Sequence, residues 1–327
     1  MSVDTYQGPV EGTGLGVTLM HEHVFVMAPE LALNYPRYAG WDEDAAIDAA
    51  VDRLAALYDA GVGTIVDATI LGLGRMPGVV ARVAARSPVR IVAATGVYVM
   101  ADLPLYLKLR GPGALFDEPE PLVDLFITDL TEGLCGTAGV RAGVIKCTTD
   151  RAGMTPDVER GVRAAARAHL ATGAPIITHT NAWKRTGLDQ QRVLAEEGVD
   201  LSRVVIGHSG DTDDIDYLVR LLEGGSYLGM DRFGLDWYLP TDDRVAVIAG
   251  LCRDGWASRL VLSHDAACHN DAFRREAMGR AAPDHHHRFL TADVVPRLRT
   301  AGVSAGDLDR MLVENPRRIL DYRKEPA

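Results

Sequence analysis

Residues 17–23, VTLMHEH, form a short run of apolar and β-branched side chains that ends in two histidines. Eight runs of this kind recur along the chain, and amphipathic segments of helix length separate them. Each run is apolar almost without interruption, which is typical of a strand buried on both faces, as in a parallel sheet covered by helices. Eight strands alternating with helices predict an α/β fold, the (β/α)8 TIM barrel. The other runs span residues 64–70, 91–98, 142–147, 175–180, 204–209, 226–231 and 260–265.

The segments between these runs carry the sequence signals of helices. Thr155, with a proline directly after it, can cap the start of one helix, and Gly173 can end it in the left-handed conformation. Residues 304–320 predict a closing helix, which Asn315 and Pro316 interrupt or bend.

Composition limits the class of protein. The chain has 327 residues, 47% hydrophobic and 24% charged, which suits a single barrel domain over residues 1–327. The net charge of −11, with no cluster of basic residues, argues against nucleic acid as a partner. No segment has the pattern of a signal peptide or a membrane span, so we expect no membrane association and a cytoplasmic location.

The cysteines agree with that location. Their spacing forms neither a disulfide framework nor a zinc ribbon, so we expect reduced thiols. They are Cys135, Cys147, Cys252 and Cys268.

Polar side chains gather at the predicted carboxyl ends of the strands. In a (β/α)8 barrel these ends converge on one open mouth, where the catalytic residues lie, while the interior is packed. Four of the ten histidines stand at strand ends, which a random scatter would not produce. The polar residues at these ends are His21, His23, Tyr98, Lys146, His179, His208, Asp231, Arg232 and Asp265.

The pair His21 and His23 predicts one metal site. Residues two apart on a strand project to the same face, so both imidazoles can reach one cation while Glu22 points outward. Asp265 ends strand eight, which lies beside strand one in a closed barrel, and can complete the site. Taken singly, each residue could instead be a hydrogen-bonded polar side chain at the start of a loop.

His179 and His208 end adjacent strands and predict a second cation site. Lys146 ends strand four, and its ammonium group would be repelled by cations, so Lys146 either lies elsewhere or has lost its charge. A neutral amine can take up carbon dioxide and become a carbamate, an anionic group able to bridge two metal ions. The alternative is a lysine whose charged end reaches the rim of the barrel.

Seven motifs carry a resemblance to a known family. They are TLMHEH at residues 18–23, IKC at 145–147, THT at 178–180, GHSGD at 207–211, LGMDRFG at 228–234, SHD at 263–265 and NPRR at 315–318. Over essentially the whole chain, the sequence resembles the phosphotriesterase-like lactonases of the amidohydrolase superfamily.

The resemblance implies two divalent transition metal ions, zinc or else iron, cobalt or manganese. The ligands of the buried ion would be His21, His23 and Asp265, those of the exposed ion His179 and His208, and the bridging groups carboxylated Lys146 and a hydroxide.

The resemblance also implies a chemistry. Tyr98 and Arg232 favour the lactonase branch, in which the tyrosine contacts the lactone and the arginine lies by the mouth of the site; Tyr98 could otherwise be a wall residue of the barrel. Asp265 would accept the first proton and Asp211 would carry it onward. The implied substrates are N-acyl-homoserine lactones, whose hydrolysis is quorum quenching, or related γ- and δ-lactones. Slow hydrolysis of phosphotriesters such as paraoxon, and a homodimer, are implied as well.

Two alternatives stay open. The chain could be a phosphotriesterase with organophosphates as its main substrates, or a catalytically silent metal-binding barrel. Asn181 and Trp183 depart from many relatives, and the loop 266–288 lacks a tryptophan that some relatives place against the acyl chain, which puts the substrate preference in doubt. The run His285 to His287 in this loop is interpreted as a solvated feature, because no carboxylate or cysteine cluster accompanies it.

Overall fold

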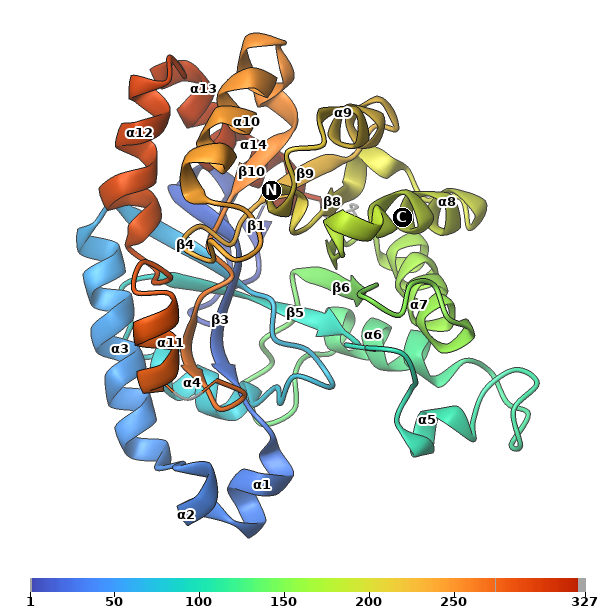
Figure 1. Cartoon of the computed structure of the whole chain (residues 1–327). Coiled ribbons are helices and arrows are strands. Elements are labelled where there is room, and N and C mark those ends of the chain that lie inside the picture. The colour runs from blue at the N-terminus through green and yellow to red at the C-terminus, as the bar shows by residue number, and fades with distance from the viewer. Residues whose placement is uncertain (1, 274, 323–327) are drawn as a thin grey trace.

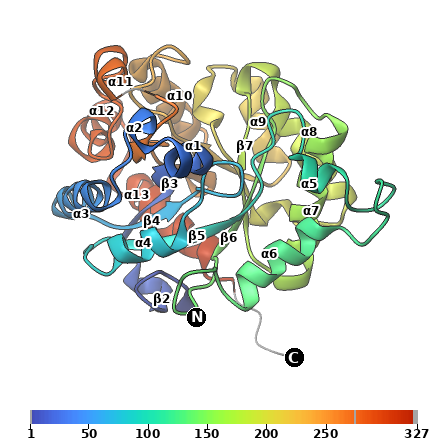
Figure 2. The same ribbon diagram turned by 90° about the horizontal axis from the view of Figure 1, so that it is seen from below.

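Parallel strands alternate with helices through the computed structural model, which describes residues 2–273 and 275–322. The two ends of the predicted domain 1–327, and one residue of the predicted loop 266–288, therefore lie outside the described residues. The main sheet has the order β10-β9-β8-β7-β6-β5-β4-β3-β11, and each neighbouring pair is parallel. Figure 2 shows helices surrounding these strands. The predicted (β/α)8 barrel is confirmed.

The eight predicted strands are all present, together with a further strand, β11. Their bounds are β3 Val17–Val26, β4 Val62–Asp67, β5 Arg90–Gly96, β6 Val144–Thr148, β7 Ile176–His179, β8 Val204–Ile206, β9 Tyr227–Met230, β10 Leu260–Leu262 and β11 Ala267–Asn270. A small antiparallel pair, β1 Ser2–Val3 and β2 Val10–Glu11, precedes them.

Helices cover the outside of the barrel and extend beyond its ends (Figure 1). Their bounds are α1 Pro29–Asn34, α2 Pro36–Ala39, α3 Glu43–Asp59, α4 Pro77–Ala84, α5 Leu105–Lys108, α6 Pro121–Thr131, α7 Pro156–Thr172, α8 Thr186–Glu196, α9 Ile215–Glu223, α10 Thr241–Arg253, α11 Arg275–Ala281, α12 Val295–Thr300, α13 Ala305–Asp309 and α14 Asn315–Leu320. Among residues 2–273 and 275–322, none of these helices combines the length and the apolar character that crossing a bilayer requires.

The barrel closes between β3 and the segment that follows β10. The N–H of Asp265 donates to the carbonyl of His21 at 3.0 Å, and the N–H of His23 donates to the carbonyl of Ala266 at 2.9 Å. β11 then continues along β3, with Ala267 opposite His23. Strand one and the end of strand eight are therefore neighbours, as the predicted metal site requires.

The strands are buried on both faces, as their continuous apolar runs predict. Met20, Val66 and Val92 belong to an apolar cluster inside the barrel. Leu19 and Ile65, each next in sequence to one of these, pack in a larger cluster with the helices. The period of two in a strand produces this division.

The helix ends follow the sequence signals. Thr155 Oγ1 accepts a hydrogen bond from the N–H of Val158 at the start of α7, and Gly173 ends that helix with φ of +79°. The predicted interruption of the closing helix is confirmed, because a π-helical turn, Arg310–Glu314, separates α13 from α14 just before Asn315.

The interpretation of the His285 to His287 run as a solvated feature is wrong for most of the run. His287 is buried, with its Nε2 3.7 Å from Glu22 Oε2, and His285 is half-buried against the carbonyl of Phe233. Only His286 is exposed. The loop 266–288 also contains β11 and α11, so much of it is regular structure.

Candidate metal centre

Three predicted ligands meet where the barrel closes. His21 and His23 project from the same face of β3, and both Nε2 atoms face Asp265 Oδ1, at 3.6 Å and 3.1 Å respectively. The ligand atoms of the three residues all lie within 4.8 Å of one another. Their placement is that of the first predicted site.

Lys146 lies beside this group and does not reach the rim. Its side chain is 1% exposed, and its Nζ is 2.8 Å from His21 Nε2. Burial lowers the pKa of Lys146 to about 8, so an uncharged amine is accessible close to neutral pH. The alternative of a lysine whose end reaches solvent is therefore wrong.

His179 and His208 form the second group. His208 Nε2 is 2.9 Å from His179 Nδ1 and 3.9 Å from Asp265 Oδ2, so Asp265 lies between the two groups. Burial lowers the pKa of both histidines, which keeps their imidazoles neutral and able to bind a cation. Neutral imidazoles, a carboxylate and a readily deprotonated amine make a donor set that fits two transition metal ions.

The backbone at three strand ends is strained. His208, Arg232 and Asp265 have φ of 57°, 63° and 58°, a left-handed conformation that side chains other than glycine seldom adopt. Such strain persists only where surrounding contacts impose it, and it clusters at functional sites.

Asp231 orients two of the predicted ligands, a role that the sequence did not indicate although the residue stands at a strand end. Its Oδ1 is 2.7 Å from His208 Nδ1, and its Oδ2 is 3.5 Å from His21 Nδ1. These nitrogens are opposite to the Nε2 atoms that face the other predicted ligands, so Asp231 fixes the rings rather than joining the ligand set. Burial would raise the pKa of Asp231, but the two histidines outweigh it and hold the pKa well below its usual range.

Two further contacts, also missed from the sequence, hold the other histidines. His23 Nδ1 is 2.8 Å from Thr69 Oγ1, and this hydroxyl donates to Asp67 Oδ1 at 2.6 Å. His179 Nε2 is 3.3 Å from Asp150 Oδ2. In the sequence, only the position of these residues marks them. Asp67 and Thr69 stand at the end of the second strand, and Asp150 follows the fourth.

Arg232 connects the metal centre to Asp211. Its Nε donates to Asp265 Oδ2 at 2.9 Å, and its Nη1 donates to Asp211 Oδ2 at 2.8 Å. The buried guanidinium of Arg244 lies 2.9 Å from the other oxygen of Asp211. A guanidinium does not give up its proton in proteins, so the two carboxylates are joined by a fixed cation and not by a direct proton route.

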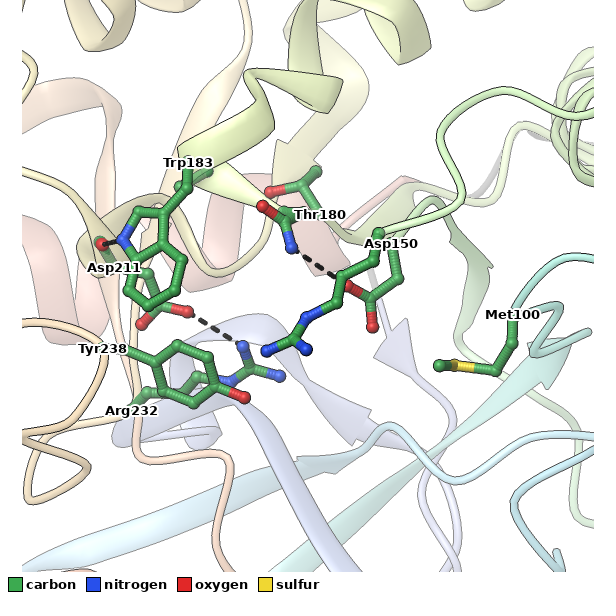
Figure 3. Close-up of a pocket in the computed structure, with 10 residues that line it drawn as sticks. Met100, Asp150, Thr180, Trp183, Asp211, Arg232 and Tyr238 are labelled. Carbon is green, nitrogen blue, oxygen red and sulfur yellow. Dashed lines mark hydrogen bonds and ion pairs between the residues drawn. The ribbon is translucent and has the colours of Figure 1, made fainter.

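A pocket of about 220 Å³ opens beside these residues (Figure 3). Trp183 and Tyr238 form one wall, where the Trp183 indole N–H donates to the carbonyl of Asp211 and the Tyr238 ring lies 4.9 Å from the Arg232 guanidinium. The residues that line it are Met100, Asp150, Arg151, Thr180, Asn181, Ala182, Trp183, Asp211, Arg232 and Tyr238.

Tyr98 lies beside His179, in the second group of predicted ligands. Its ring packs edge-on against the ring of His179, with 5.3 Å between centroids. Burial raises the pKa of Tyr98, so the hydroxyl keeps its proton and can act as a hydrogen-bond donor.

The site and the fold agree with comparisons to known proteins. Residues 1–320 match the model of the Phosphotriesterase family. A "Phosphotriesterase homology protein" of Mycobacterium tuberculosis is 52% identical over 319 residues, which cover 98% of this chain and 97% of the relative. An "Aryldialkylphosphatase" of Saccharolobus solfataricus is 39% identical over 312 residues, covering 95% and 96%.

A solved structure extends the agreement to three dimensions. The structure of the phosphotriesterase from Mycobacterium tuberculosis superposes with a TM-score of 0.97 and 51% identity, covering 100% of both chains. Family match, sequence identity and fold lead to one conclusion: the chain belongs to the phosphotriesterase family of metal-dependent hydrolases, within the amidohydrolase superfamily.

Proposed function

We propose that this hydrolase opens lactone rings, with N-acyl-homoserine lactones or related γ- and δ-lactones as main substrates and phosphotriesters such as paraoxon as slower ones. The observation that carries the proposal is the placement of Tyr98 and Arg232, the two residues that mark the lactonase branch by resemblance. Tyr98 packs against His179, and Arg232 forms part of the pocket wall. Such an activity on acyl-homoserine lactones would make the protein a quorum-quenching enzyme.

The proposed cofactor is a pair of zinc ions. The residues that would hold them are His21, His23 and Asp265 on one side, His179 and His208 on the other, and Lys146 as a bridging carbamate. When bound, two such ions lower the pKa of a shared water and polarise the carbonyl of the substrate.

The chain's own residues would orient the substrate and move the proton. Tyr98 donates a hydrogen bond to the lactone oxygen as that oxygen gains negative charge. Asp265 accepts the proton of the attacking water. The histidines and Arg232 outweigh burial and hold the pKa of Asp265 well below its usual range, so its side chain is ionised. The predicted transfer of this proton onward to Asp211 would have to pass Arg232, whose guanidinium keeps its protons; Asp211 instead contributes by fixing that guanidinium. The bond between the carbonyl carbon and the ring oxygen then breaks, the ring oxygen takes up a proton from solvent, and the product is a hydroxy acid.

The wall of the pocket supports a substrate with an apolar chain. Trp183 is 56% exposed and Met100 54%, so both offer apolar surface to an acyl group at the mouth. Most of the other lining residues are polar or charged, among them Asp150, Arg151 and Asn181. Apolar contact beside polar groups that fix orientation is usual in sites for small molecules.

Phosphotriester hydrolysis as the main activity is the second candidate, and the names of the relatives favour it. The two are separated by kcat/KM for a long-chain acyl-homoserine lactone and for paraoxon, measured on one metal-loaded preparation. A higher value for the lactone supports the lactonase, and a higher value for paraoxon overturns it in favour of the phosphotriesterase. No turnover of either, with the metal sites full, would favour a silent barrel or another ester or amide.

Three further proposals concern the whole protein. We propose one catalytic domain and a homodimer, and the exposed side chains of Leu33, Tyr35 and Tyr38 around α1 and α2 are candidates for its interface. We also propose a cytoplasmic location, which the free thiols of all four cysteines support. The small-molecule lactone remains the proposed partner.

A further inference from the structure

Glu22 lies between His21 and His23 in the sequence but projects from the opposite face of β3, where it is fully buried. Both oxygens of its carboxylate accept hydrogen bonds. Its Oε1 accepts hydrogen bonds from Ser263 Oγ at 2.8 Å, from the N–H of His264 at 2.7 Å and from His264 Nδ1 at 3.1 Å. Its Oε2 accepts one from the N–H of Ala266 at 3.0 Å. All four donors come from the segment that follows β10.

Asp265 is the residue at the centre of this segment. Its own N–H donates to the carbonyl of His21, so the N–H groups of His264, Asp265 and Ala266 all donate to groups of β3. Glu22 accepts two of these three hydrogen bonds. The left-handed backbone of Asp265, with φ of 58°, is therefore held from both sides by one carboxylate.

The site requires a carboxylate and not merely a polar side chain. A carboxylate accepts hydrogen bonds at both oxygens and donates none. In a glutamine, the amide NH₂ would face either the N–H of Ala266 or the three donors around Oε1. Two donors would then oppose each other in a buried position, which is unfavourable.

We infer that Glu22 is a positioning residue, whose buried carboxylate fixes the backbone on both sides of Asp265 and so sets the direction in which Asp265 presents its oxygens to the metal centre. This inference rests on the proposed role of Asp265 as a ligand. It is independent of whether the substrate is a lactone or a phosphotriester.

The same carboxylate connects the loop 266–288 to the metal centre. His264 Nε2 accepts a hydrogen bond from the N–H of Leu290 at 2.7 Å, so its Nδ1 carries the proton that faces Glu22. The ring of His287 packs edge-on near the ring of His264, with 6.4 Å between centroids. The end of the loop and the residues just after it therefore lie against Glu22 and His264, which accounts for the burial of His287.

The test is the zinc affinity of metal-free protein, measured by competition with a chromophoric chelator. Glu22→Gln is compared with Glu120→Gln, because Glu120 is another buried glutamate, which accepts hydrogen bonds from Leu122 and Arg160 between α6 and α7. Both variants should lower the Tm of the metal-free protein. We expect only Glu22→Gln to weaken zinc binding, by about 10- to 100-fold.

The outcomes separate the inference from its premise through a third variant, Asp265→Ala. If Asp265→Ala weakens zinc binding and Glu22→Gln does not, Glu22 has only a structural role and the inference is overturned. If Asp265→Ala also leaves the affinity unchanged, the ligand assignment fails and the inference with it. Should Glu22→Gln not fold, Glu22→Asp serves instead, since it keeps the charge but withdraws the oxygens from the two N–H groups; unchanged affinity there again overturns the inference.

Discussion

Arg232 Nε donates a hydrogen bond to Asp265 Oδ2 at 2.9 Å, which leaves Asp265 Oδ1 to face His21 and His23. The two oxygens of this carboxylate thus have separate partners. One oxygen is available to the metal centre, and the other is fixed by a cation that Asp211 holds from its far side. Loss of the guanidinium would release Asp265 from one of its constraints.

Replacement of Arg232 by lysine should therefore impair catalysis although the charge is kept. The lysine side chain is shorter, and its single ammonium group lacks the planar set of donors with which the guanidinium contacts Asp265 and Asp211 at the same time. We expect kcat/KM to fall by about 10-fold or more in Arg232→Lys. Arg163→Lys, which alters an ion-pair group on α7 at the surface, is the control and should stay within about twofold of wild type. Equal kcat/KM values for Arg232→Lys and Arg163→Lys would contradict the role given to Arg232.

Metal loading should depend on pH through Lys146. Burial disfavours the ammonium form and lowers the pKa of Lys146 to about 8, so the neutral amine prevails above that pH and falls about tenfold for each unit below it. Metal uptake by metal-free protein should speed up as pH rises from about 6 to about 8, and added bicarbonate should speed it further. Lys146→Met should take up little metal at any pH, with or without bicarbonate. Uptake in wild type that ignores bicarbonate would argue against the carbamate.

Gly207 should tolerate no side chain. A Cβ there would lie 2.0 Å from the carbonyl oxygen of Thr178 and 3.3 Å from His21 Nδ1. We expect Gly207→Ala to lower the free energy of unfolding by about 2 kcal/mol or more, measured by urea denaturation. Gly250→Ala in α10 is the control, since its nearest neighbour would be 3.7 Å away and alanine favours a helix by about 0.5 kcal/mol or more. An unchanged free energy of unfolding in Gly207→Ala would show that β7 and β8 can move apart without loss of stability.

Tyr98→Phe should lower turnover and leave metal binding intact. The variant removes the hydroxyl and keeps the ring against His179. We expect kcat for a lactone to fall by about 100-fold with little change in KM, as for the loss of one oxyanion donor. An unchanged kcat would instead make Tyr98 a wall residue of the barrel.

The apolar runs predicted the barrel because strands buried on both faces leave a continuous signal in the sequence. Their ends were less predictable. β8 and β10 end at Ile206 and Leu262, before the predicted residues 209 and 265. His208 and Asp265, which follow these strands, have a left-handed backbone that apolar periodicity does not indicate.

The predicted ligands come together because barrel topology alone places strand ends at one mouth. The residues that orient them were not predictable in the same way. Asp231 contacts ring nitrogens of His208 and His21, and Asp150 contacts one of His179. Asp67 acts on His23 through the Thr69 hydroxyl. Such contacts depend on rotamers and register that no periodicity records. His287 was misinterpreted for a related reason, because its partner Glu22 lies at the other end of the chain.

The most direct measurement is metal content together with lactone hydrolysis, for wild type and for Lys146→Ala prepared in parallel. The account predicts two metal ions per chain and lactone turnover in wild type, with both lost in the variant. Full metal content with no turnover of lactone or paraoxon in wild type, or an unchanged pair of ions and unchanged turnover in Lys146→Ala, would contradict it.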